Sequence, residues 1–166
     1  MEERPKIIPV LDPIDRVLNY LALGLLAFSW IYVIYYYPSL PETIPTHFDH
    51  KGTVDGHGNK LTIFILPIIG TIVFTGVGSL NRVPYIFNYA VKITPENAER
   101  QYKIATRTMR YIKTIIQLVL AVIIFKTVAN VQGKDEGLGE WFLPGFLLIL
   151  FIPLGIMFFT AIKSKK

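Results

Sequence analysis

PSLPETIPTHFDHKGTVDGHGNK, residues 38–60, is the stretch that decides the fold of this chain. It contains all three histidines of the protein, together with three acidic residues and three prolines, whereas the segments on both sides of it are apolar. We therefore interpret the chain as a bundle of membrane helices that displays one polar loop. Prolines favour extended backbone before them, and the glycine-rich second half favours turns, so we expect a small folded cap over the helix ends.

The composition supports a membrane protein of one domain, residues 1–166. Of the 166 residues, 52% are hydrophobic and 17% are charged, compared with about 25% charged in an ordinary soluble domain. The absence of cysteine excludes disulfides and thiolate chemistry. The net charge is +5, but the basic residues are spread over separate segments that flank apolar ones, so we predict no nucleic-acid partner.

Four apolar segments predict an all-α integral membrane protein with transmembrane helices at residues 17–37, 61–80, 111–130 and 141–162. The first segment would span about 31 Å as a helix, which matches one hydrocarbon core. It exceeds the apolar region of a secretory signal, so we interpret it as a retained anchor. The third helix is expected to start at Pro95, after Thr94 as its N-cap, and to run to about Asn130. Gln117 inside it is expected to bond to another helix.

The distribution of lysine and arginine predicts that both termini are cytoplasmic and that the polar loop is an outer loop. Lys126 and the loops on one side contribute only four basic residues, Lys51, Lys60, Lys126 and Lys134. The other side carries thirteen: Arg4, Lys6, Arg16, Arg82, Lys92, Arg100, Lys103, Arg107, Arg110, Lys113, Lys163, Lys165 and Lys166.

The segment 81–110 is predicted to be a cytoplasmic loop that leads into an amphipathic helix. Its charged face includes Arg100, Lys103, Arg107 and Arg110, which fall within about 100° of arc at helical spacing. Three interpretations remain open: a solvated face, a contact with anionic lipids, and a docking face for a cytoplasmic protein partner.

The polar loop also raises the question of a metal site, because His47, Asp49, His50, Asp55 and His57 are ligand types suited to zinc or copper. If Lys51-Gly52 closed a two-residue hairpin, Phe48 would face Asp55 and Thr46 would face His57. The set His50, Asp55 and His57 would then share one face, with His47 and Asp49 on the other. Three ligands make at most an open site, and the alternative is that these side chains fix the loop by hydrogen bonds.

Enzymatic activity is not expected. The four predicted spans contain no acidic residue, no histidine and no arginine. Intramembrane proteases and proton-coupled transporters place ionisable groups of these kinds inside the bilayer. We predict no cofactor.

The segment Leu40-Pro41-Glu42-Thr43-Ile44-Pro45-Thr46-His47-Phe48, followed by Gly52, Asp55 and Lys60, resembles the bacterial membrane family named domain of unknown function 1648. It is also similar to the N-terminal module of SdpI-type membrane proteins, which confer immunity to a secreted toxic peptide and relay its presence to a repressor. The resemblance implies a protein of the bacterial inner membrane with a ligand-binding or structured outer loop. The implied site residues are His47, Phe48, Gly52, Asp55 and Lys60.

Three functions therefore stay open. The first is a sensing or immunity-like membrane protein that binds an extracellular peptide or small ligand through the outer loop and contacts a protein on the cytoplasmic side. The second is an accessory or structural subunit of a transporter or envelope complex. The third is a metal-binding protein of the outer face. All three place the chain in contact with the lipid bilayer.

Overall fold

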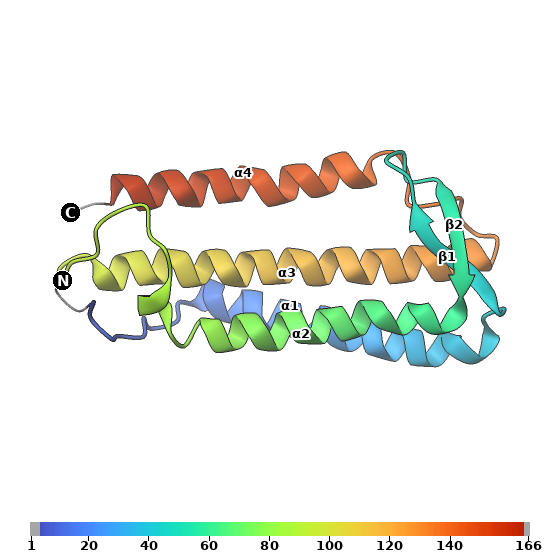
Figure 1. Ribbon diagram of the computed structural model, residues 1–166, viewed down its shortest axis with the longest axis horizontal. Helices are drawn as coiled ribbons and strands as arrows, with labels where there is room; N and C mark the ends of the chain where they lie inside the picture. Colours follow the sequence, from blue (N-terminus) through green and yellow to red (C-terminus); the bar gives the residue numbers. More distant parts are fainter. Residues whose placement is uncertain (1–3, 165–166) are drawn as a thin grey trace.

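The computed structural model describes residues 4–164 and confirms the all-α membrane architecture (Figure 1). Four helices are long and apolar enough to cross a membrane. The helices are α1 (Pro13–Tyr36), α2 (Ile65–Leu80), α3 (Ala98–Val131) and α4 (Phe142–Lys163), and the strands are β1 (Thr43–Phe48) and β2 (Val54–Asn59). Short 3₁₀ helices lie at Tyr37–Ser39 (η1), Lys60–Phe64 (η2) and Pro84–Ile86 (η3).

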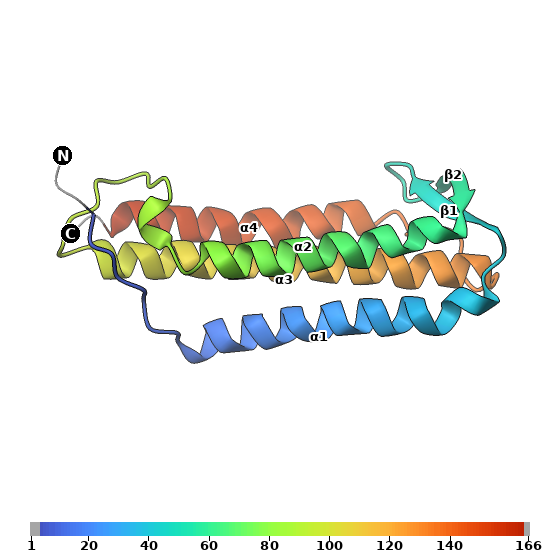
Figure 2. The ribbon, with the colours of Figure 1, turned by 60° about the horizontal axis from the view of Figure 1, so that its bottom comes forward.

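The helices run side by side along the long axis of the molecule, and the two strands form an antiparallel hairpin at one end (Figures 1 and 2). We call this the hairpin end. Residue 4 and the last turn of α4 lie at the opposite end, which we call the terminal end. The polar loop thus folds into the cap that the sequence predicts.

Helix α3 is the centre of the bundle and packs against the three other helices. Half of its most apolar stretch is buried inside the protein, whereas none of the corresponding stretch of α4 is. Gln117 is fully buried and donates a hydrogen bond from Nε2 to the carbonyl oxygen of Gly70 on α2, at 2.7 Å. This confirms the predicted interhelical bond. A Cβ atom on Gly70 would lie 2.9 Å from the Gln117 Oε1 atom, so a side chain there would displace the buried amide.

The predicted start of the third helix at Pro95 is wrong by three residues, since α3 begins at Ala98. Thr94 instead opens a hydrogen-bonded turn. Its N–H donates to the side-chain oxygen of Asn97 at 3.0 Å, and its carbonyl accepts from the N–H of Ala98 at 2.9 Å. The Asn97 side chain therefore holds residues 94–97 as a turn ahead of the helix.

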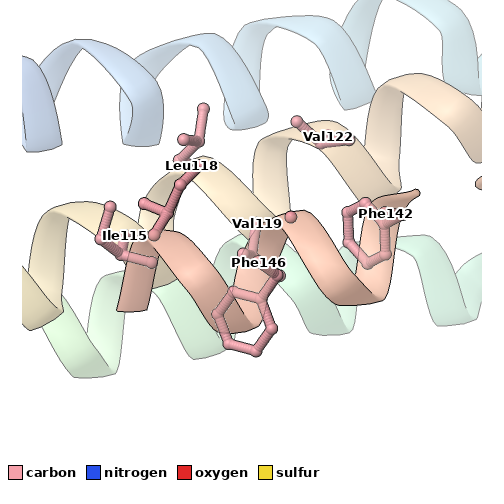
Figure 3. A pocket seen from close by; sticks show the side chains of 8 residues that line it. Ile115, Leu118, Val119, Val122, Phe142 and Phe146 are labelled. Carbon is pink, nitrogen blue, oxygen red and sulfur yellow. The ribbon is translucent and has the colours of Figure 1, made fainter. Parts of the chain in front are cut away.

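Hydrogen bonds hold helix α4 at its two ends and also between them, where the Tyr111 hydroxyl on α3 donates to the Ile149 carbonyl. At the hairpin end, the Leu138 N–H in the loop before α4 donates to the Gly52 carbonyl at 2.6 Å. At the terminal end, Gln101 Nε2 on α3 donates to the carbonyls of Ala161 (3.0 Å) and Ser164 (2.9 Å). Between these anchors, the seam of α3 and α4 contains an apolar pocket of about 200 Å³, with Phe142 and Phe146 facing residues of α3 (Figure 3).

Candidate functional site

The hairpin forms, but its register differs from the one predicted for a two-residue turn. Phe48 pairs with Val54, and His47 pairs with Gly56, with irregularities in the ladder between Pro45 and Phe48. The predicted pairing of Phe48 with Asp55 is therefore wrong. The reason is a longer turn over residues 49–53 together with the irregularities on β1, so of these two pairs only His47 with Gly56 keeps the partner that a two-residue turn gives.

Asp49 builds that longer turn. Its backbone N–H donates to the Thr53 carbonyl at 2.9 Å, and its Oδ1 accepts the N–H groups of Lys51 and Thr53, both at 2.8 Å. These backbone donors hold the pKa of the Asp49 carboxyl below its usual value. Asp49 thus has a structural role as an ionised cap of the turn.

The new register brings His47 and Asp55 together instead of placing them on opposite faces. His47 Nδ1 lies 2.5 Å from Asp55 Oδ1. The two side chains are 72% and 45% exposed, so this pair sits at the surface of the hairpin. Gly56 faces His47 at this point, and a Cβ atom on it would lie 2.9 Å from the His47 Cβ. The glycine therefore makes room for the histidine.

The predicted metal ligands do not converge. Within residues 4–164, no group of three or more His, Asp or Glu side chains is arranged to hold a metal ion. Asp55 contacts His47, which was not in the predicted set of His50, Asp55 and His57. The alternative interpretation, in which polar side chains fix the loop by hydrogen bonds, fits Asp49 and the contact between His47 and Asp55.

Lys60 closes the base of the hairpin. Its Nζ lies 2.9 Å from Glu42 Oε1 and 5.3 Å from the centre of the Tyr37 ring, and its backbone N–H donates to the Glu42 carbonyl at 3.0 Å. The lysine thus joins the end of β2 to the chain that leaves α1. This fixes the angle at which the hairpin leaves the bundle.

Gly52 places the tip of the hairpin against the loop before α4. Its φ is +78°, and a Cβ atom would lie 2.7 Å from the Gly139 carbonyl oxygen. A side chain at Gly137 would meet the Gly52 carbonyl in the same way. The two loops therefore touch backbone to backbone, which only glycine permits.

A cavity of about 450 Å³ lies beneath β1, where the hairpin meets the first turns of α2 and the last turns of α3. Its polar rim includes Thr46 and His47 of β1, and Thr62 and Thr127 also line it. The apolar lining consists of Ile44, Pro45, Phe48, Ile63, Ile65, Leu66, Ile123 and Leu138. An apolar cavity with a few polar groups at its mouth is the usual form of a small-ligand site.

Comparison with known proteins relates the hairpin and its flanking helices to a family of unknown function. Residues 24–71 match the family model described as Domain of unknown function (DUF1648). The DUF1648 segment runs from the middle of α1 through the hairpin into α2, and it contains all five residues that the resemblance implied as a site. An SdpI-type role and a bacterial origin stay predictions.

A relative from Archaeoglobus fulgidus, named only as an uncharacterized protein, is 42% identical over 55 residues. These cover 33% of this chain and 28% of the relative, so less than a third of either chain is compared. No solved structure matches the chain.

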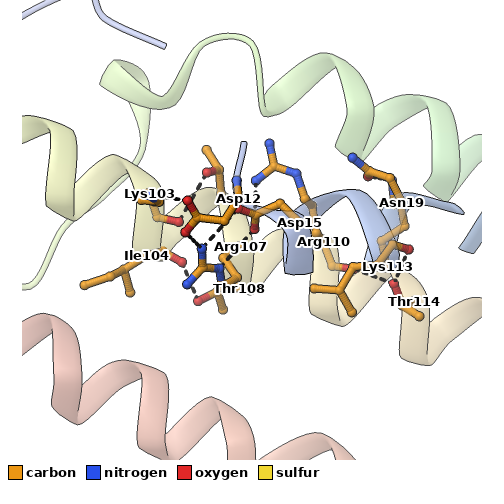
Figure 4. Close-up of polar contacts among 12 residues, drawn as sticks. Asp12, Asp15, Asn19, Lys103, Ile104, Arg107, Thr108, Arg110, Lys113 and Thr114 are labelled. Atoms are coloured by element: carbon orange, nitrogen blue, oxygen red, sulfur yellow. Dashed lines mark hydrogen bonds and ion pairs between the residues drawn. The ribbon is translucent and has the colours of Figure 1, made fainter. Parts of the chain in front are cut away.

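Most residues of the predicted partner face at the terminal end form ion pairs with Asp12 and Asp15 of the same chain (Figure 4). Lys103 Nζ lies 2.7 Å from Asp12 Oδ1, and Arg107 forms a forked pair with Asp15 at 3.0 and 3.1 Å and also contacts Asp12. Arg110 is buried and lies 3.8 Å from Asp15 Oδ1. These three residues join α3 to α1.

Of the four residues predicted as a partner or lipid face, Arg100 is exposed. Sequence reasoning missed Asp12 and Asp15 as the partners of the other three. A signal was present, because two acids three residues apart precede the first span and the third helix carries the basic arc. A role of this face toward a cytoplasmic partner stays a prediction.

Proposed function

We propose that this is a non-enzymatic multi-pass membrane protein that binds a peptide or small lipid-like ligand beneath its outer hairpin, in a sensing or immunity-like role. The observation that carries the proposal is the cavity of about 450 Å³ between β1, α2 and α3. It lies where an apolar bundle meets a polar cap, so a ligand with an apolar part and a polar end suits it.

The rigidity of the rim supports binding. Asp49 fixes the turn, Lys60 fixes the base, and Gly52 docks the tip on the loop before α4. A cavity whose walls are held in advance loses little conformational entropy when a ligand enters.

The orientation that we propose places the hairpin outside the cytoplasm and both chain ends inside. The bias of basic residues toward the terminal end supports it, with Lys165 and Lys166 outside the described residues. Leu138 would connect ligand binding to helix α4 in such a receptor. It lines the cavity, and its N–H is bonded to the hairpin tip directly ahead of α4, so a ligand would contact the segment that leads into α4.

Site-specific photocross-linking tests the proposal. A benzophenone amino acid replaces Phe48 in the cavity wall or, as a control, Lys51 on the exposed turn, and membranes of the producing cells are illuminated. We expect a discrete peptide or lipid adduct at position 48 and none at position 51. Thr46→Trp, which fills the cavity mouth, should remove the adduct, whereas Thr53→Trp on the exposed turn should not.

The same adducts at positions 48 and 51, or an adduct that survives Thr46→Trp, would refute binding in the cavity. A single protein adduct would instead favour the second candidate, an accessory subunit of a larger complex. The observation that favours this candidate is α4, whose apolar stretch buries no residue inside the protein.

A further inference from the structure

The terminal end holds more positive charge than its carboxylates neutralise. Asp15 is 1% exposed, and Arg107 occupies both of its oxygens. The Asp15 Oδ2 also accepts the backbone N–H of Asp12 at 3.0 Å. Arg110, 6% exposed, is left with a 3.8 Å approach to the same carboxylate. The two carboxylates thus face three cations, Lys103, Arg107 and Arg110.

Lys113 has only neutral partners among the interactions that the structure shows. It is 2% exposed, its Nζ donates to Asn19 Oδ1 at 2.8 Å, and the same atom lies 4.4 Å from the centre of the Phe74 ring. Charges buried in proteins are normally paired with opposite charges. A buried lysine held by an amide and an aromatic ring therefore leaves a positive field at this point.

A cleft of about 350 Å³ opens on α1 and shares Asn19 with this lysine. It is lined by Leu11, Arg16, Asn19 and Tyr20. Asn19 takes part in both, since its oxygen accepts a hydrogen bond from Lys113 (Figure 4) and its side chain lines the cleft. The cleft therefore combines an exposed guanidinium, an amide and a phenol with an uncompensated ammonium behind them.

The position of the cleft along α1 indicates which class of anion is available to bind there. Arg16, Asn19 and Tyr20 occupy the first two turns of α1, a helix long enough to span the membrane, so they lie near the boundary of headgroups and hydrocarbon. Leu11 and the Tyr20 ring add apolar surface beside the charged groups. The positive end of the α1 dipole also lies here.

We propose that this cleft binds the phosphate group of an anionic phospholipid in the adjoining leaflet. Arg16 contacts the phosphate directly, Asn19 donates to it, and Lys113 supplies charge through Asn19. This site is independent of the ligand proposed for the hairpin end.

Native mass spectrometry of the full chain tests the site, with phosphatidylglycerol or phosphatidylcholine added to protein in detergent. We expect phosphatidylglycerol to be retained and phosphatidylcholine to be lost. Arg16→Gln and Lys113→Gln should each weaken phosphatidylglycerol binding about fivefold. Lys92→Gln removes an equal charge from an exposed position of the same end and should leave binding unchanged.

Lys113→Arg controls for damage to the fold, because it keeps the charge and should restore most of the binding. The proposal fails if both lipids are retained equally, if Arg16→Gln has no effect, or if Lys92→Gln weakens binding as much as Arg16→Gln. Displacement of the lipid by an equal concentration of inorganic phosphate would show a site for the free ion and would overturn the assignment to a lipid.

Discussion

Asp15 is the residue whose charge we expect to matter most for stability. It is 1% exposed, and its carboxylate receives two N–H donors of Arg107 and one backbone N–H of Asp12. Asp15→Asn keeps the shape and removes the charge, so Arg107 and Arg110 lose their buried counter-ion. Breaking a buried ion pair by changing one partner costs about 3–5 kcal/mol.

The loss can be measured as the free energy of unfolding in mixed micelles of a mild detergent and dodecyl sulfate, followed by helical circular dichroism. Asp12→Asn serves as the comparison. It changes the neighbouring carboxylate, whose side chain is 38% exposed, and we expect a clearly smaller effect. Arg107→Gln and the double variant with Asp15→Asn complete a double-mutant cycle.

The cycle should give a coupling energy well above that of an exposed pair. The double variant should therefore lose less unfolding free energy than the two single variants lose together. A loss below about 1 kcal/mol for Asp15→Asn would refute the reasoning, because exposed ion pairs contribute that little. Strict additivity in the cycle would refute it independently, because it would show that Asp15 does not act through Arg107.

Three further predictions concern other parts of the chain. Gly137→Ala, at a φ of +91°, places a methyl group on the hairpin backbone, so hydrogen exchange in the hairpin should accelerate and stability should fall by about 1–3 kcal/mol. Gly70→Ala crowds Gln117 and should cost about 1–3 kcal/mol in the same unfolding assay, whereas Gly76→Ala, with open space around it, should not destabilise the protein. Lys103 and Arg107 hold the pKa of the Asp12 carboxyl in the folded protein below its ordinary value of 3.8. The carboxylate therefore contributes its full share of folding stability above pH 3.8, and this share is lost as the pH falls through the lower pKa of the folded state. Unfolding measured at decreasing pH, for the unchanged protein and for Asp12→Asn, gives the size of this loss.

The helices could be predicted from the sequence because their signal is strong and local. An apolar run of membrane length allows few alternatives, and the four runs indeed form four helices. Gln117 was equally predictable, since a polar amide in the middle of a span needs a partner on another helix.

The register of the hairpin could not be predicted because it depends on one side chain. Asp49 accepts two backbone N–H groups and thereby lengthens the turn, which moves His47 next to Asp55. A shift of this size redirects side chains on a strand, so the predicted metal set was lost with the register. Sequence spacing alone does not distinguish a two-residue turn from a turn closed by an aspartate.

Contacts between segments that are distant in the sequence could not be predicted either. The basic arc of α3 was recognised, and two acids near the start of α1 were a signal for its partners, but the sequence does not show that α1 and α3 pack side by side. The same holds for the contact of Gly52 with the loop before α4.

The contact of Gly52 with Leu138 joins the turn of the hairpin and the loop before α4 into one structural unit. Gly52 and Leu138 share a backbone hydrogen bond, and a side chain at Gly52 or Gly137 would collide with the backbone of the facing loop. The lengths of the two loops are therefore coupled, and a residue inserted in one requires an adjustment in the other. An epitope tag intended to report the orientation of the protein belongs elsewhere, because at either loop it would separate the hairpin from the start of α4.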